Sequence, residues 1–215
     1  MKVAYLLYPG FTALDVTGPH EVLNSVPDVE SVFVAETPGP LRNESDTLSL
    51  VADRSLDEVR DPDILVVPGG YGTRALLDHE PLLAWIREVH ENTIWTASAC
   101  TGSLLLAAAG LLEDAPATTH WLAKDTLAGL GADPRSERVV THGKIVTAAG
   151  VSSGIDMALG LVQTIYGDEL AQAVQLGIEY DPEPPFDSGS PEKAAPEIRD
   201  AVAAVFAANE AAARP

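Results

Sequence analysis

The chain has 215 residues, 46% of them hydrophobic, and 32 acidic side chains against 13 basic ones give it a formal net charge of −19. This length and composition suit one sizeable domain with an apolar core. The charge argues against nucleic acid and anionic membranes as partners, because a protein needs a basic surface to neutralise phosphate groups.

The sequence also predicts the compartment in which the protein works. Residues 1–9 predict a buried strand rather than a signal peptide, and no apolar run approaches the roughly 18 residues of a membrane helix. A single cysteine cannot form an internal disulfide, so we expect a cytoplasmic protein. The acidic excess leads to the hypothesis of a salt-rich (halophilic) cytoplasm, and an ordinary acidic protein is the alternative.

Taken in chain order, apolar runs typical of strands buried on both faces occupy residues 3–8, 32–35, 64–67, 94–99 and 145–148. Weaker strand patterns occur at 48–52, 117–119 and 138–141. Helical periodicity fills the intervals, at 16–25, 81–90, 104–109, 121–130, 153–166 and 169–177. This alternation predicts an α/β fold with a mostly parallel sheet covered on both faces, in which ligands bind at the carboxyl ends of the strands.

The carboxyl-terminal part of the chain has a different pattern. Residues 181–191 predict a loop, because they contain too many prolines for a helix or a strand interior. Residues 194–212 are alanine-rich and predict a helix, with a modest apolar stripe at Ala201, Val202, Val205 and Phe206. We therefore expect an α/β domain over residues 1–192 and a helix within 193–215 that docks on the domain or at a subunit interface.

Cys100, the only cysteine, lies at the turn between the predicted strand at 94–99 and the helix that follows. A residue at such a turn projects above the carboxyl edge of the sheet, which is the geometry of a nucleophile elbow. The positive end of the following helix is expected to favour the thiolate. The alternative is a small buried hydrophobe, since free cysteine is among the most buried residue types.

Asp15 follows the first strand closely and has two interpretations. Thr12 and Asp15 have the spacing of a capping box, and an acid in a first helical turn complements the helix dipole. Alternatively, Asp15 is a carboxyl group within reach of the thiol, and it can move protons if burial raises its pKa.

Two further segments flank the predicted elbow. The Thr101 hydroxyl can donate to the sulfur, and its backbone N–H can face a forming anion, although Thr101 is also a helix-capping residue. Pro68-Gly69-Gly70-Tyr71-Gly72 ends the strand at 64–67, and its N–H groups form a candidate oxyanion hole. A Pro-Gly-Gly turn is a weak signal without the cysteine.

The five histidines show no zinc-site spacing, so we expect neither a metal nor a cofactor. His120 is the one histidine at a predicted strand end where a cysteine–histidine pair can form. A structural role at the turn between strand and helix is the alternative for this residue.

Together these residues resemble the ThiJ/PfpI superfamily, whose fold is a flavodoxin-like, class I glutamine-amidotransferase-like α/β/α sandwich. Within it, the aspartate at 15 and the threonine at 101 point to the branch that hydrates isonitriles. The resemblance covers nearly the whole chain. The matching segments are Leu14-Asp15-Val16-Thr17-Gly18-Pro19, Pro68-Gly69-Gly70, Ala99-Cys100-Thr101-Gly102-Ser103, Ala117-Thr118-Thr119-His120-Trp121, Gly154-Ile155-Asp156, Glu179-Tyr180, Pro184-Pro185-Phe186 and Gly189-Ser190-Pro191.

What the resemblance implies is a hydro-lyase that converts a small isonitrile into an N-substituted formamide. Cys100 would attack the isonitrile carbon and Asp15 would move the protons. Thr101 would hold the thiolate, and N–H groups near Gly70 and Tyr71 would line the pocket. The resemblance also implies a homodimer.

Other members of the superfamily keep three alternatives open. A glyoxalase or deglycase would favour a glutamate at position 15 or a histidine partner for the thiol, and neither is evident. A cysteine redox sensor or ligand-binding module needs an accessible thiol of low pKa. A peptidase is disfavoured because Thr101 replaces the adjacent histidine. The domain also resembles the amino-terminal half of certain transcription regulators, but the chain ends at Pro215 after one helix, so we expect no DNA-binding half.

Overall fold

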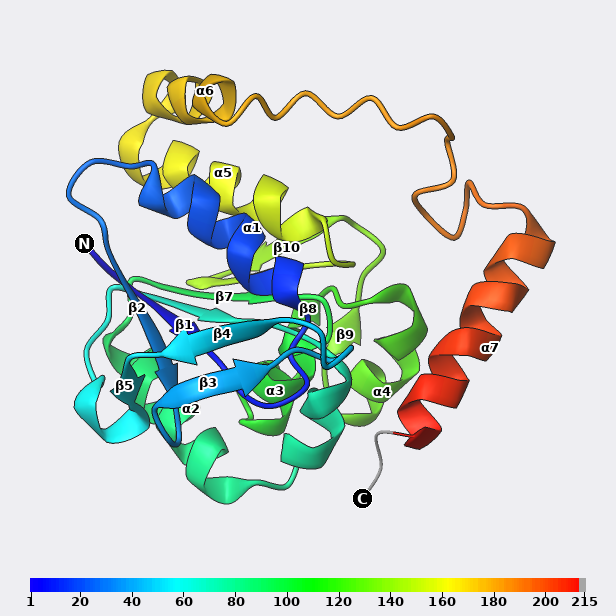
Figure 1. The fold of residues 1–215 in the computed structure, drawn as a ribbon, viewed down its shortest axis with the longest axis horizontal. Coiled ribbons are helices and arrows are strands. Elements are labelled where there is room, and N and C mark those ends of the chain that lie inside the picture. The colour runs from blue at the N-terminus through cyan, green and yellow to red at the C-terminus, as the bar shows by residue number, and fades with distance from the viewer. Residues whose placement is uncertain (213–215) are drawn as a thin grey trace.

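A central sheet of seven strands, ordered β10-β11-β7-β6-β1-β2-β5, organises the computed structural model, which describes residues 1–212 (Figure 1). Neighbouring strands are parallel except β10, which runs antiparallel to β11. The strands of this sheet are β1 (Lys2–Leu6), β2 (Glu30–Ala35), β5 (Arg54–Ser55), β6 (Ile64–Val67), β7 (Trp95–Ala99), β10 (Val139–His142) and β11 (Ile145–Ala148). β1, β6, β7 and β11 are almost wholly buried, as their unbroken apolar runs require.

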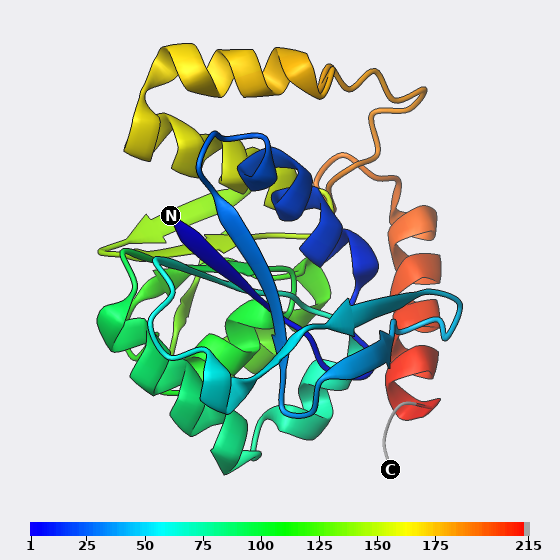
Figure 2. The ribbon, with the colours of Figure 1, turned by 60° about the vertical axis from the view of Figure 1, so that its left-hand side comes forward.

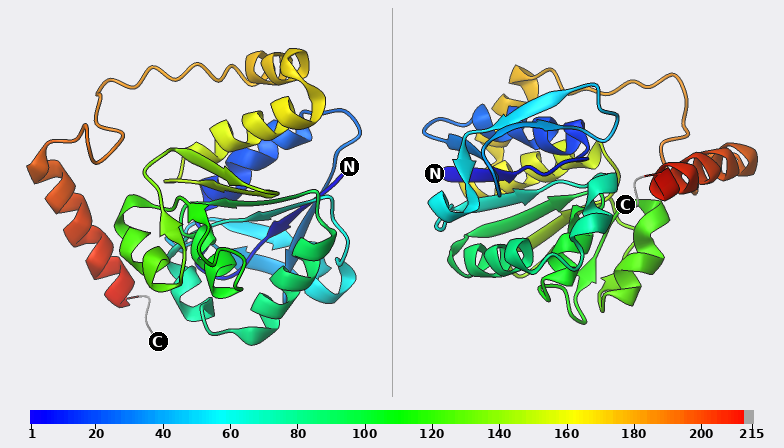
Figure 3. Two further views of the ribbon diagram at one scale, coloured as in Figure 1. Left: turned by 180° about the vertical axis from the view of Figure 1, so that it is seen from behind. Right: turned by 60° about the horizontal axis from the view of Figure 1, so that its bottom comes forward.

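Helices cover both faces of this sheet and make the fold a three-layer sandwich (Figures 1 and 3). One layer contains α1 (Ala13–Asn24) and α5 (Ser153–Tyr166), with α6 (Asp168–Gly177) packed on α5 further from the sheet. The other layer contains α2 (Glu80–Asn92), α3 (Gly102–Ala108) and α4 (Lys124–Gly129). In α2, for example, Leu82, Ile86 and Val89 are buried at helical spacing, so one stripe of the helix packs on the sheet. The predicted α/β/α sandwich is therefore confirmed.

Two glycines let α1 and α5 pack side by side over the sheet (Figure 1). A Cβ atom on Gly18 would lie 3.0 Å from the Ile155 side chain, and one on Gly154 would lie 3.1 Å from Pro19. Larger side chains would push the two helices apart, so this close approach explains glycine at both positions. It also fixes the start of α1, which carries Asp15, relative to the sheet.

The smaller elements lie around the carboxyl edge of the sheet and along its sides (Figure 2). Two-stranded sheets are formed by β3 (Gly39–Arg42) with β4 (Ser49–Ala52) and by β8 (Pro116–Ala117) with β9 (Asp133–Pro134). Short 3₁₀ helices occur at η1 (Leu56–Glu58), η2 (Tyr71–Leu76) and η3 (Trp121–Ala123). After α6, an extended segment leads to α7 (Pro196–Ala212), which stands apart from the three layers.

Some elements differ from the predicted ones. The helix predicted at 121–130 is divided into η3 and α4, and the strand predicted at 117–119 ends at Ala117. The sequence pattern missed β3, which contains Pro40, and the two-residue strands β5 and β9, which are too short to show an alternation.

The predicted division between 192 and 193 falls in the exposed segment between α6 and α7, and it stays a prediction. Residues 213–215, the last three of the predicted carboxyl-terminal segment 193–215, lie outside the described residues. Within residues 1–212, no helix combines the length and the apolar character needed to cross a membrane.

Candidate active site

Cys100 occupies the turn between β7 and α3 with a backbone φ of 54°, a left-handed conformation that is uncommon for a residue with a side chain. Its N–H group donates to the carbonyls of Ala148 and Ala149, at 3.1 and 2.8 Å. Its carbonyl accepts from the hydroxyls of Ser103, at 3.3 Å, and Thr119, at 3.0 Å. These bonds on both sides of the residue hold the strained turn in place, so the structure contains the predicted elbow.

Asp15 lies in the first turn of α1 and is completely buried. Its Oδ2 accepts a hydrogen bond of 2.8 Å from the Gly69 N–H, while its Oδ1 has no partner of normal geometry among residues 1–212. Burial raises the pKa of Asp15 to about 8, although the Gly69 N–H and the Cys100 thiol each lower it somewhat. The Thr12 side chain makes no capping hydrogen bond, so the geometry favours the buried carboxyl over the capping box.

Our expectation that the helix end favours a Cys100 thiolate is wrong. Cys100 is only 5% exposed, and burial raises the pKa of its thiol well above the usual value. The neighbouring Asp15 raises this pKa further, and the Thr101 N–H and the Arg74 guanidinium lower it by less. The Thr101 N–H at the start of α3 lowers the thiol pKa by less than the loss of water around the sulfur raises it. At neutral pH, the thiol and the carboxyl therefore both favour their protonated forms.

The Thr101 hydroxyl contacts Gly70 rather than the sulfur, which is a second correction. Its Oγ1 accepts from the Gly70 N–H at 2.9 Å and donates to the Gly70 carbonyl at 3.2 Å. The part of Thr101 that interacts with the thiol is its backbone N–H. A Cβ atom on Gly69 would lie 2.4 Å from the Thr101 nitrogen and 2.9 Å from Asp15 Oδ2, so only glycine fits between the two site residues.

The N–H groups predicted to line the pocket both have protein acceptors. That of Gly70 donates to Thr101, and that of Tyr71 donates to Glu44 Oε2 at 3.3 Å. The longer and more exposed bond, at Tyr71, is the one that a substrate oxygen can replace more easily. The nearby carboxylate of Glu44 also raises the pKa of Asp15 and of Cys100.

His120 has a structural role at the start of η3. Its Nδ1 accepts from the Leu122 N–H at 3.4 Å, and burial lowers the pKa of the ring to about 4, so the imidazole is neutral. Among residues 1–212, no hydrogen bond joins a histidine to Cys100, and no group of three His, Cys, Asp or Glu side chains is placed to hold a metal ion.

Residues 1–164 match the DJ-1/PfpI family. The chain belongs to this family. It is 42% identical over 200 residues to a protein named isonitrile hydratase from Pseudomonas putida, an alignment that covers 93% of this chain and 87% of that protein. A ThiJ/PfpI family protein from Pseudomonas syringae has a crystal structure that matches with a TM-score of 0.93 at 36% identity, covering 99% of this chain and 88% of that one. The predicted superfamily is confirmed.

A second kind of relative within the DJ-1/PfpI matches is a regulator. The chain is 29% identical to the HTH-type transcriptional regulator CdhR from Pseudomonas aeruginosa, over 79% of this chain and 52% of the regulator. The chain thus spans about half the length of that relative.

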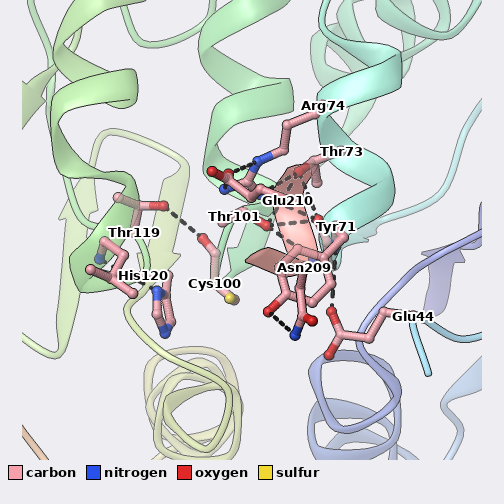
Figure 4. Close-up of polar contacts among 12 residues, drawn as sticks. Glu44, Tyr71, Thr73, Arg74, Cys100, Thr101, Thr119, His120, Asn209 and Glu210 are labelled. Atoms are coloured by element: carbon pink, nitrogen blue, oxygen red, sulfur yellow. Dashed lines mark hydrogen bonds and ion pairs between the residues drawn. The ribbon is translucent and has the colours of Figure 1, made fainter. Parts of the chain in front are cut away.

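Two cavities lie near the cysteine elbow of this DJ-1/PfpI chain, lined by neighbours of Cys100 rather than by Cys100 itself. The first, the Tyr71 cavity, has a volume of about 840 Å³ and is lined by Tyr71, Glu44 and Asn209 among others. The second, the His120 cavity, has a volume of about 390 Å³, and its lining includes His120 and Thr119. Figure 4 shows the Cys100 sulfur pointing into the space between His120 on one side and Tyr71 with Asn209 on the other.

Several residues near the thiol had no role predicted from the sequence. Glu44 reaches the site because a short parallel bridge joins Phe11 to Asn43, two segments far apart in the chain. Thr119 was part of a recognised motif but had no predicted role, and Arg74 follows the glycine turn without any marker of function. Only the predicted meeting of strand ends at one edge of the sheet could have directed attention to them.

Proposed function

We propose that this protein hydrates isonitriles to N-substituted formamides, with Cys100 as nucleophile and Asp15 as proton donor and acceptor. The observation that carries the proposal is the fully buried Asp15 carboxyl beside the buried Cys100 thiol. The 42% identity to a protein named isonitrile hydratase supports the choice of substrate.

The first step forms a covalent thioimidate. The Cys100 sulfur bonds to the terminal carbon of R–N≡C, the protonated Asp15 gives its proton to that same carbon, and the thiol proton passes to Asp15. In the product, R–N=CH–S–Cys, the former isonitrile carbon has gained one C–S bond and one C–H bond, and no group has left. A carboxyl with a pKa of about 8 suits both the giving and the taking of a proton near neutral pH.

The second step releases the product. The protonated Asp15 donates its proton to the thioimidate nitrogen as water adds to the carbon, and the resulting carboxylate accepts a proton from that water to give R–NH–CH(OH)–S–Cys. This adduct then expels the sulfur and passes its hydroxyl proton to it through Asp15, which leaves R–NH–CHO. The thiol recovers a proton, and the enzyme returns to its starting state. The Thr101 N–H, which already lies near the sulfur, stabilises negative charge that develops there.

The roles of Gly70 and Tyr71 in substrate binding, and the oligomeric state, are also proposals. Gly70 keeps the Thr101 side chain in place, and the Tyr71 N–H exchanges its bond to Glu44 for one to the substrate. We propose a homodimer on the family resemblance and a cytoplasmic location on the single cysteine.

The test is formamide production from phenyl isonitrile in molar salt, with methylglyoxal consumption measured in parallel, for wild type, Cys100→Ala and Asp15→Asn. We expect many turnovers per wild-type chain, none for Cys100→Ala and a loss of at least about 100-fold for Asp15→Asn, since a positioned general acid or base contributes that much or more. Turnover of methylglyoxal alone would replace the hydratase by a glyoxalase. Reaction of Cys100 with a thiol probe, without turnover of either substrate, would indicate a sensor.

A further inference from the structure

Helix α7 is anchored directly over the candidate active site. The Arg74 guanidinium pairs with Glu210 at 2.5 Å, and its Cζ lies 5.4 Å from the centre of the Phe206 ring. The Asn209 side chain donates to the Tyr71 hydroxyl at 3.1 Å. Figure 4 shows Asn209 and Glu210 on the same side of the site as Tyr71 and Arg74. The far end of the chain therefore contacts the same turn that carries Gly70.

Phe206 bridges the two sides of the space toward which the cysteine points. Its ring stacks on His120 with a centroid distance of 5.1 Å and an interplanar angle of 4°, and it lies 5.3 Å from the Tyr71 ring. Tyr71 lines one cavity and His120 lines the other. The Phe206 side chain thus contacts one lining residue of each cavity, and Cys100, which lines neither of them, is only 5% exposed.

The rest of α7 contributes little to the core. Val202 and Val205 are 46% and 61% exposed, and the partly buried positions, Ala203, Phe206 and Glu210, form one narrow stripe. A long exposed segment connects the helix to α6. A helix that buries only the stripe facing the site is better explained by a role at the site than by a role in holding the fold together.

We propose that α7 is the roof of the active site and that Phe206 sets the size of the substituent that can approach Cys100. Compact substituents fit beneath the ring, whereas bulky ones need it removed or displaced. This inference rests on the proposed function for the identity of the substrate, but the coverage of the thiol does not depend on the reaction.

Chemical modification of Cys100 tests the roof independently of catalysis, because the chain has no other cysteine. The rates of reaction with iodoacetamide, which is small, and with N-(1-pyrenyl)maleimide, which is bulky, are compared for wild type, Phe206→Ala and Val205→Ala. We expect Phe206→Ala to accelerate the bulky reagent at least tenfold and the small one less than threefold. Val205→Ala, on the exposed side of the same helix, should change neither rate. Unchanged rates, or equal acceleration of both reagents, in a Phe206→Ala protein of normal melting temperature would overturn the proposal.

The same variants then test substrate size. The kcat/KM for 2-naphthyl isonitrile relative to that for methyl isonitrile should rise at least tenfold in Phe206→Ala and stay constant in Val205→Ala. A constant ratio in both variants would overturn the assignment of Phe206. If the alkylation rates separate as expected while no form of the protein consumes either isonitrile, the roof stands and the hydratase proposal fails.

Discussion

Asp15 is the residue on which stability and chemistry conflict. A carboxyl with no exposed surface strongly disfavours its charged form, and one N–H donor from Gly69 only partly compensates for the missing water. The result is a pKa raised from 3.8 to about 8. A proton is therefore available at neutral pH from a group that would be ionised in the unfolded chain.

Replacing Asp15 by asparagine should stabilise the protein increasingly as the pH rises. The folded carboxyl keeps its proton up to a pKa of about 8, whereas the unfolded one loses it near 3.8. The native state therefore binds more protons between these values, and wild-type stability falls as pH rises through this window, by at most about 1.4 kcal/mol per pH unit. The advantage of Asp15→Asn in free energy of unfolding should grow from pH 5 to pH 8 and level off above, as urea titrations at each pH can measure.

Asp53→Asn is the matched control, because Asp53 is an exposed acid whose removal takes the same charge from the chain. Its effect on unfolding should be small at every pH. An Asp15→Asn advantage that stayed constant from pH 5 to pH 8 would show that this carboxyl titrates in the folded protein as it does in the unfolded chain.

Single residues also mark the limit of what the sequence could reveal about the site. Cys100 and Asp15 were found because each follows a predicted strand, and parallel strands that end at one edge bring such residues together. The direction of the thiol pKa was predicted wrongly, since the burial of the sulfur and the nearness of Asp15 and Glu44 depend on contacts distant in the sequence. Phe206 was assigned to an apolar stripe, but no pattern could place that stripe against His120.

At the scale of elements, the junction of β6 with α3 holds the site together. Gly102, the first residue of α3, would bring a Cβ atom within 2.1 Å of the Val67 carbonyl oxygen and 2.7 Å of that of Pro68. The helix can therefore start directly against the neighbouring strand only with glycine at this position. This close approach places the Cys100 elbow beside the Gly69 turn.

Gly102→Ala should move α3 away from β6 and destabilise the fold by about 2 kcal/mol or more, because overpacking against rigid backbone has few ways to relax. Gly129→Ala in α4 is the matched control: nothing lies within 4 Å of its added Cβ, and alanine is the better helix former. Thermal unfolding should show a lower melting temperature for the first variant and an equal or higher one for the second. Equal melting temperatures for Gly102→Ala and wild type would mean that the junction is looser than these distances imply.

Helices and strands were easier to predict where their burial follows a regular pattern of apolar residues in the sequence. β6, β11 and α5 have the predicted bounds, because each is a continuous apolar run or a helix with one buried stripe. β3 and β9 escaped prediction because their pairing depends on tertiary contacts rather than on a local alternation. The course of the chain from α6 to α7 was predicted only as a loop, because exposed proline-rich segments carry no signal of direction.

At the scale of the whole molecule, the formal net charge of −19 means that repulsion between acidic side chains opposes the folded state. The ion pairs among the described residues do little to offset it, since their side chains are mostly exposed; in Lys193–Asp187, for example, they are 56% and 79% accessible. Repulsion between the remaining acidic groups acts across the folded surface and weakens as salt shortens the screening length from about 10 Å at 0.1 M to about 3 Å at 1 M.

Stability should therefore rise with salt, which is also the test of the salt-rich cytoplasm hypothesis. We expect the melting temperature to increase by about 4–8 °C between 10 mM and 1 M KCl, equivalent to about 2 kcal/mol for a chain of this size. The triple variant Asp53→Asn, Glu113→Gln, Glu183→Gln removes three exposed acids and should melt higher than wild type in dilute buffer but gain less from salt. Because that variant keeps every ion pair found among residues 1–212 and the whole core, a difference confined to low salt isolates self-repulsion from general effects of KCl. A wild-type melting temperature that did not change with KCl would rule out self-repulsion as a limit on stability.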